Sequence, residues 1–183
     1  MDFGRIHQQG ISLIEAIIAI AVAGILSALA IPSFNHLRAS SAMAGSVNLF
    51  LAQLHLARST AVTRERHITL CPASSPSTCD DDHKAWKNGY LIFEDSNKNH
   101  ERDTDEQIIS YEEKAGAAIR IFSSSQSRNR ISFLPLGRAW LSNTTVRFCH
   151  PDHPDLNRAI IVSNNGRVRS SNKMADGSAI TCP

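Results

Sequence analysis

The sequence lacks the short patterns that mark the common catalytic sites. It contains no G-x-S-x-G nucleophile elbow, no H-E-x-x-H motif and no phosphate-binding P-loop. It also has no C-x-x-C or H-x-x-x-H spacing, so its four cysteines and eight histidines do not predict a zinc site. No internal repeat is visible, and aromatic residues make up only 6% of the chain. We therefore expect no enzymatic activity, no bound metal and no cofactor.

A long apolar run is present near the N-terminus. From Ile11 to Ile31 the only charged residue is Glu15. As a helix rising about 1.5 Å per residue, this segment would span roughly 30 Å, enough to cross the hydrocarbon core of a bilayer. A carboxylate in a membrane helix is costly and indicates a functional site. An uncleaved anchor and a secretory signal cleaved after residues 28–30 (Ala-Leu-Ala) are the alternatives.

The residues around Gly10 and Glu15 resemble the signal of type IV pilins and type II secretion pseudopilins, in which a short leader ends in Gly and the fifth mature residue is Glu. The first mature residue is Ile11, where family members usually have Phe. The resemblance implies that a prepilin peptidase cuts after Gly10 and methylates the amino group of Ile11. It further implies that Glu15 pairs with the amino terminus of another pilin subunit during filament assembly. The chain would be a single-pass inner-membrane protein with a periplasmic head, later carried in a pilus at the cell surface.

The chain then divides into four parts. These are a leader over residues 1–10, a transmembrane helix over 11–31, an amphipathic continuation of that helix over 32–65 and a globular head over 66–183. Pro32 is expected to bend or break the helix, because proline has no amide hydrogen to donate.

Apolar residues resume at helical spacing after Pro32 and should end with the helix near Arg64. They form a stripe that we expect to pack against a sheet, made of Met43, Val47, Phe50, Leu54, Ala57 and Ala61. The polar or small positions expected on the opposite side are Ser41, Asn48, Gln53 and Ser59.

From His67 onwards the pattern changes to short stretches rich in Ile, Val, Phe and Tyr, separated by Ser, Asn, Gly and Pro. Seven strands are expected, at residues 67–71, 89–94, 107–111, 118–122, 130–133, 146–150 and 159–163. One long helix followed by a run of strands predicts an α+β fold, in which a small antiparallel β-sheet or β-sandwich head packs on the helix.

The four cysteines lie in the part that would be exported, where disulfides persist. Four thiols allow three pairings, and the sequence does not choose among them. We favour Cys71 with Cys79, which closes a short loop, and Cys149 with Cys182, which pins the C-terminal tail to a strand.

Four segments resemble, in the same order, those of the GspH/FimT group of minor pilins: residues 56–71, 86–95, 131–138 and 160–169. The resemblance covers nearly the whole chain. It implies a low-abundance subunit of a type IV pilus or secretion pseudopilus, with a pilin-like fold and no catalytic activity.

Charge is distributed unevenly along the head. Residues 80–113 contain 11 acidic and 4 basic side chains, whereas residues 114–183 contain 10 basic and 3 acidic ones. The two segments carry formal net charges of −7 and +7, which the whole-chain value of +2 conceals. Eight of the ten basic residues are arginines, whose planar guanidinium groups suit phosphate.

Gly166-Arg167-Val168-Arg169 is the strongest candidate for a binding site in this basic region. In an extended segment, side chains two residues apart face the same way, so Arg167 and Arg169 should project together while Val168 faces inward. Gly166 permits the tight turn that presents them. This Gly-Arg-x-Arg element resembles the C-terminal motif of FimT-type DNA-uptake pilins, and the predicted DNA-binding set is completed by Lys173, Arg158 and Arg147.

Two arginines in a strand are also compatible with solvated charges that prevent aggregation. Because no ladder of aromatic residues interleaves the basic cluster, base stacking is not expected. Binding to duplex DNA should then be directed to the backbone, largely independent of sequence and strongly sensitive to salt.

The acidic segment suggests a second kind of site. Oxygen-bearing side chains occupy positions 1, 3, 5, 9 and 12 of a calcium-loop pattern, namely Asp95, Asn97, Asn99, Asp103 and Glu106. Position 6, however, is His100 where that pattern requires Gly, and both flanks have the character of strands. We therefore favour a hairpin loop in which Asp and Asn residues form turns.

The sequence as a whole predicts a minor type IV pilin that binds extracellular DNA and supports its uptake in natural transformation. A structural minor pseudopilin of a type II secretion system, without DNA binding, is the first alternative. A calcium-stabilised adhesive head is the second.

Overall fold

The computed structural model describes residues 12–113, 119–139, 141 and 143–182. The predicted cleavage and methylation positions, Gly10 and Ile11, lie outside this range. The chain divides into two compact units, residues 1–38 and residues 39–183, and each is described by itself.

Helix α1 runs from Leu13 to Arg64. Ser12 caps its start, because the Ser12 hydroxyl accepts a hydrogen bond from the Glu15 amide at 3.3 Å. At the other end Glu65 adopts a positive φ of 54°, and the Arg66 amide donates to the carbonyl of Ala61 at 3.2 Å. This is the pattern of a Schellman motif, so both ends of the helix are defined by local hydrogen bonds.

Of the two outcomes expected at Pro32, a bend or a break, the break does not occur. The backbone stays helical through residue 32, and α1 is a single element of 52 residues. A proline removes one hydrogen bond of the helix, and the turns on either side keep theirs.

The apolar stripe of α1 is buried as predicted. All six of its residues are at most 5% exposed. One residue expected on the polar side, Gln53, is buried instead, because its amide donates to the Glu112 carboxylate at 2.7 Å. Two sheets pack on α1, so the side of the helix opposite the apolar stripe is not wholly exposed to solvent. The spacing of apolar residues in α1 did not reveal the contact between Gln53 and Glu112.

The head contains two antiparallel sheets of four strands each. The first has the order β3-β2-β1-β5, with β3 at Ile108–Glu113, β2 at Gly89–Glu94, β1 at Ile68–Pro72 and β5 at Ile131–Phe133. The second has the order β4-β6-β7-β8, with β4 at Arg120–Phe122, β6 at Thr144–Cys149, β7 at Arg158–Val162 and β8 at Val168–Ser171. Seven strands match those predicted, and β8 is an additional one.

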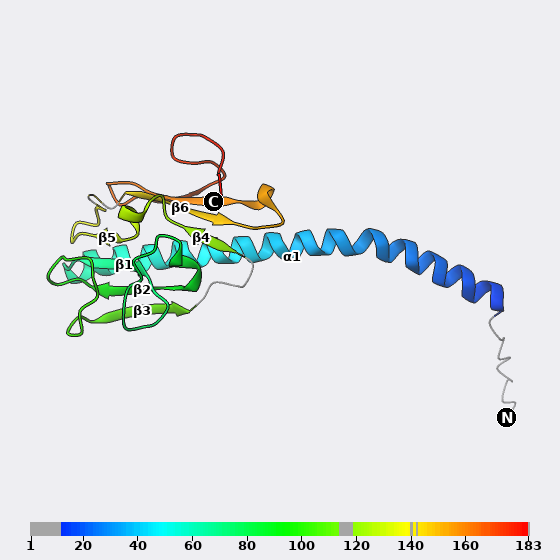
Figure 1. The fold of residues 1–183 in the computed structure, drawn as a ribbon, viewed down its shortest axis with the longest axis horizontal. Coiled ribbons are helices and arrows are strands. Elements are labelled where there is room, and N and C mark those ends of the chain that lie inside the picture. Colours follow the sequence, from blue (N-terminus) through cyan, green and yellow to red (C-terminus); the bar gives the residue numbers. More distant parts are fainter. Residues whose placement is uncertain (1–11, 114–118, 140, 142, 183) are drawn as a thin grey trace, which may run out of the picture. The chain divides into compact units, whose positions relative to one another are not determined.

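The two sheets share one core with α1. In Figure 1 the sheet with β2 and β3 lies on one side of the head part of α1, and the sheet with β4 and β6 lies on the other. Phe50 of α1 joins them, because its ring packs edge-on against Tyr90 at 5.0 Å and against Phe148 at 5.5 Å. Burial and the nearby Glu112 raise the pKa of Tyr90 above its ordinary value. The α+β architecture predicted from the sequence is confirmed.

Both favoured disulfides form. Cys71 is bonded to Cys79, and Cys149 is bonded to Cys182. The second bond fastens the C-terminal tail to β6, as expected.

Candidate functional site

The turn between β7 and β8 presents the predicted arginine pair. The Gly166 amide donates to the carbonyl of Ser163 at 2.8 Å, and the Ser163 amide donates to the carbonyl of Arg167 at 3.0 Å. Gly166 has a φ of +72°, a conformation that side chains disfavour. Gly166 therefore forms the tight turn that was expected of it, in a conformation suited to glycine.

Gly166 also lies against a second turn, at Gly137. A Cβ atom added to Gly166 would stand 1.9 Å from the Gly137 carbonyl oxygen, closer than any real contact. The Ala139 amide donates to the carbonyl of Asn164 at 3.0 Å, which links the same two turns through their backbones. Glycine is thus required at position 166 for space as well as for conformation.

The side chains of the Gly-Arg-x-Arg element alternate as predicted. Val168 is half-buried and packs against the core, whereas Arg167 and Arg169 are exposed. Val168 pairs with Val162 and Arg169 with Ile161 across the ladder of β7 and β8. Among the described residues, neither guanidinium has an ion pair or a hydrogen bond to a protein group.

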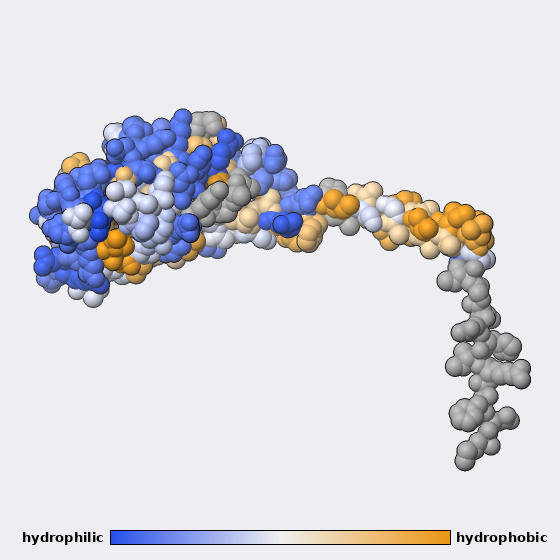
Figure 2. All heavy atoms as spheres, turned by 60° about the horizontal axis from the view of Figure 1, so that its bottom comes forward, coloured by the Kyte–Doolittle hydropathy of each residue, from blue (hydrophilic) through white to orange (hydrophobic). Residues whose placement is uncertain are grey.

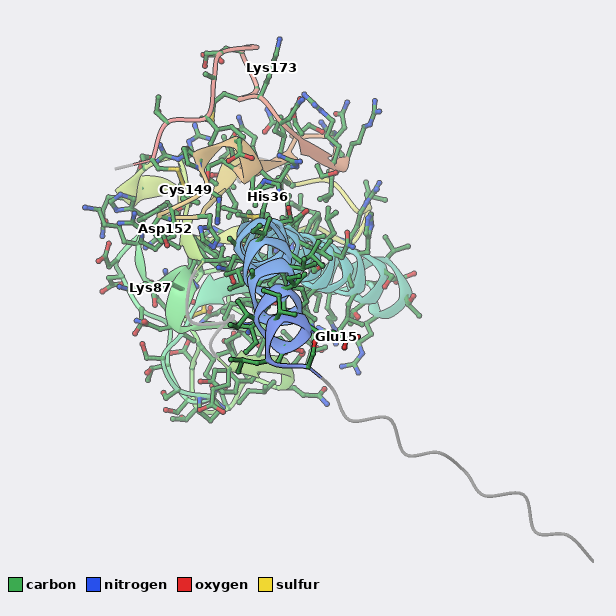
Figure 3. All side chains as sticks on the ribbon, turned by 90° about the vertical axis from the view of Figure 1, so that its right-hand side faces the viewer. Glu15, His36, Lys87, Cys149, Asp152 and Lys173 are labelled. Atoms are coloured by element: carbon green, nitrogen blue, oxygen red, sulfur yellow. A yellow bond between two sulfur atoms is a disulfide. The ribbon has the colours of Figure 1, made fainter. Side chains whose placement is uncertain are left out.

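Lys173 lies in the loop that follows β8. Figure 3 shows its side chain pointing outward, away from the sheet. The loop is closed by the Met174 amide, which donates to the carbonyl of Ser178 at 2.9 Å. Beside it the Ser178 hydroxyl donates to the Asp176 carboxylate and lowers the pKa of that group. Lys173 and Arg158 both line an open hollow of about 610 Å³ between the loop and β7.

Arg147 and Arg158 do not form one surface with the arginine pair. Arg147 lies beneath the C-terminal tail and donates to the carbonyl of Thr181 at 2.8 Å. Arg158 pairs with Phe148 and lies two residues before the core residue Ile160, so it shares the face of these core residues and lies on the other face of the sheet from Arg169. The six predicted residues therefore fall into three groups. Arg167 and Arg169 form an exposed pair on the turn at Gly166, Lys173 lies in a separate loop, and Arg147 and Arg158 lie elsewhere on the sheet.

Arg138 is a neighbour of the pair that the predicted set omitted. It is exposed and directly follows Gly137, whose carbonyl contacts Gly166. The sequence feature that could have indicated Arg138 is its place in the segment 131–138, which resembles a family motif. Its proximity to Arg167 depends on two turns that are far apart in the sequence.

A further basic residue, Arg130, forms ion pairs with the acidic segment. The Arg130 side chain is only 11% exposed and forms ion pairs with Asp81 at 3.1 Å and with Glu101 at 2.9 Å. The acidic and basic segments of the head are thus joined at this point, whereas no such ion pair to Arg167 or Arg169 is found among the residues that the structure describes.

The loop between β2 and β3 has the form of a hairpin closed by its own side chains. The buried Asp95 carboxylate accepts hydrogen bonds from the Thr69 hydroxyl at 2.8 Å and from the His100 amide at 3.2 Å. The amide groups of Asn97 and Asn99 both donate to Asp103. These bonds agree with the favoured prediction of a turn-forming loop.

A histidine beside this loop has a perturbed pKa. Partial burial of His67 is the main cause that lowers its pKa, and the neighbouring Lys98 lowers it further. Both effects disfavour the imidazolium form, whereas the nearby Asp95 carboxylate favours it and offsets part of the lowering of the pKa.

The N-terminal part of α1 has the character of a membrane span. In the described part of the chain, α1 alone is long and apolar enough to cross a bilayer, and its apolar window is fully exposed. Figure 2 shows apolar residues gathered along this part of the helix and a largely polar surface on the head. Glu15 lies exposed in the first turn, where the positive end of the helix dipole favours a carboxylate.

Comparison with known proteins agrees with this arrangement. Residues 46–166 match the family model of the Type II transport protein GspH, and residues 5–31 match the prokaryotic N-terminal methylation motif. The first match ends at Gly166, so Arg167 and Arg169 follow it directly. No curated protein matches the chain.

Two solved structures share the fold. Both are crystal structures of the type IV minor pilin FimU from Pseudomonas aeruginosa PAO1. One is 20% identical with a TM-score of 0.56, over 70% of this chain and 87% of that one. The other is 19% identical with a TM-score of 0.53, over 69% and 90%. The long helix packed on a small antiparallel head is thus the type IV pilin fold, and the chain belongs to the family of the Type II transport protein GspH, among the minor pilins and pseudopilins.

Proposed function

We propose that this chain is a minor pilin that binds duplex DNA through Arg167 and Arg169 and supports DNA uptake in natural transformation. The observation that carries the proposal is the exposed arginine pair, which has no compensating acidic partner among the described residues. Guanidinium groups on adjacent outward positions of an extended segment can contact successive phosphates. Lys173 would extend the contact along the loop after β8, and Arg138 would extend it on the side of Gly137.

The N-terminal signal supports the delivery of this surface to the outside of the inner membrane. The methylation motif implies processing by a prepilin peptidase and assembly with other pilins. We propose cleavage after Gly10, methylation of Ile11 and pairing of Glu15 with a neighbouring subunit. The head would then stand in the periplasm before it enters the filament.

Charge reversal tests the proposal. The full chain in a non-ionic detergent should bind a fluorescent duplex in an anisotropy titration, and the double variant Arg167→Glu, Arg169→Glu should abolish that binding while the circular dichroism spectrum is unchanged. The affinity of the unmodified chain should fall steeply with salt, with a slope of log K against log salt of about −0.9 for each phosphate contacted.

The matched control reverses two other exposed charges. Lys84 precedes a short helical turn in the acidic segment, at Ala85–Asn88, and Lys87 lies within it; both lysines are exposed. The variant Lys84→Glu, Lys87→Glu changes the net charge by the same amount and should bind nearly as well as the unmodified chain. Equal losses in both variants would contradict a localised site.

A structural role in a type II secretion pseudopilus is the second candidate. The description of the matching family favours it, because that family is named for type II transport. In this case Arg167 and Arg169 would contact other subunits, and the unmodified chain would show no binding to duplex DNA even at low salt.

A further inference from the structure

Three segments of the chain meet at one side chain of α1. The Arg58 guanidinium donates from Nε to the carbonyl oxygen of Gly137 at 2.9 Å. This contact ties the helix to the turn that follows β5, which is closed by the Gly137 amide donating to the carbonyl of Leu134 at 2.7 Å. Arg58 is partly buried, so the hydrogen bond is shielded from competing water.

The third segment is the turn that carries the arginine pair. A Cβ atom placed on Gly166 would lie 1.9 Å from the Gly137 oxygen and 3.2 Å from the Arg58 Nε. The same oxygen that accepts the hydrogen bond from Arg58 is therefore the surface on which Gly166 packs. Gly137, which has a φ of +71°, shows the complementary crowding, because a Cβ there would lie 3.2 Å from the same Nε atom.

We infer that Arg58 is a positioning residue for DNA binding, which fixes the place of Arg167 and Arg169 by holding the Gly137 carbonyl. This inference rests on the proposed function. Loss of the Nε donor leaves a backbone carbonyl unpaired at a crowded junction, and the turn at Gly137 must then move to find another partner. Gly166 packs with its backbone directly on the Gly137 carbonyl. A movement of Gly137 therefore displaces the turn that presents Arg167 and Arg169.

A lysine at position 58 separates positioning from charge. Arg58→Lys keeps the positive charge but has no donor at the place of Nε, and Arg58→Ala removes both. If Arg58 positions the pair, both variants weaken DNA binding by about tenfold, because the displaced arginines no longer reach one or more of the phosphates. The salt slope of each variant should shrink by about one for each phosphate that is no longer bound, although Arg167 and Arg169 are still present.

The control removes another cation of the same helix. Arg64 ends α1, where it bonds to Gln107, just before β3, and to Glu94 of β2, away from the turn that carries Arg167 and Arg169. Arg64→Ala removes the same charge as Arg58→Ala and should leave the DNA affinity and the salt slope nearly unchanged.

Hydrogen–deuterium exchange of residues 163–169 in the full chain, without DNA, provides a second measurement. The inference predicts faster exchange at the Gly166 amide in both Arg58 variants and unchanged exchange in Arg64→Ala. The inference would be overturned if Arg58→Lys bound DNA as tightly as the unmodified chain, or if exchange over residues 163–169 were the same in the Arg58 variants as in the unmodified chain. If the unmodified chain does not bind DNA, the proposed function fails, and the exchange measurement still decides whether Arg58 controls the turn.

Discussion

Gly166 and Gly177 both adopt positive φ angles, of 72° and 86°, but their surroundings differ. A Cβ atom on Gly166 would collide with the backbone of Gly137, whereas a Cβ on Gly177 would meet no atom of the described residues within 4 Å. Comparing substitutions at these two glycines therefore distinguishes the energetic cost of an unfavourable backbone conformation from the cost of a steric clash.

We expect Gly177→Ala to lower the free energy of unfolding by about 1 kcal/mol, the usual cost of a left-handed conformation for a side chain. Gly166→Ala should cost clearly more, about 2 kcal/mol or above, because the backbone must also separate from Gly137. Urea unfolding of both variants checks this. Equal losses would mean that the contact between the two turns is looser than the distances indicate.

At the scale of elements, the second sheet depends on the C-terminal tail that crosses its outer face. The tail is fastened at Cys149 by a disulfide that closes 33 residues, and Arg147 holds it through Thr181. The other disulfide closes only 8 residues, between Cys71 and Cys79. The longer the closed loop, the more the disulfide restricts the unfolded chain.

Replacement of Cys149 and Cys182 by serine should therefore lower the free energy of unfolding by about 4 kcal/mol, and replacement of Cys71 and Cys79 by about 2.5 kcal/mol. Urea unfolding under non-reducing conditions measures both. A larger loss for the pair Cys71 and Cys79 would contradict this order. The first variant should also release the tail and the loop that carries Lys173, which limited proteolysis would detect.

The elements that could be predicted are those with a local signal. The stripe of α1 and seven strands follow from the spacing of apolar residues, and Gly166 follows from the chemistry of turns. Gln53 and Arg147 could not be predicted, because each finds its partner on an element that is distant in the sequence. For the same reason the junction of Arg58, Gly137 and Gly166 was not foreseen, although all three residues lie in segments that resemble the family.

At the scale of the whole molecule, the buried hydrophobic residues of the described chain begin at Ala39, where the second compact unit begins. The apolar residues from Leu13 to Ile31 whose exposure is described contribute nothing to that core. The head therefore has its own core, and its stability should not depend on the N-terminal part of α1.

A soluble fragment of residues 38–183 should fold alone. Its free energy of unfolding should lie within about 0.5 kcal/mol of that of the full chain in detergent, because none of the removed residues that the structure describes is buried. Urea unfolding followed by tryptophan fluorescence compares the two, since Trp86 is fully buried in the head. A much less stable fragment would indicate that residues before position 38 support the core.

The contact between Gly137 and Gly166 has a mechanical consequence. A ligand held by Arg167 and Arg169 would pull first on their turn, and this turn is tied to α1 through Gly137 and Arg58. Tension would thus reach the helix α1 without passing strand by strand through β8, β7 and β6. If the chain is part of a filament, such a path would let the filament pull a bound molecule while the hydrogen bonds between β8, β7 and β6 carry little of the force.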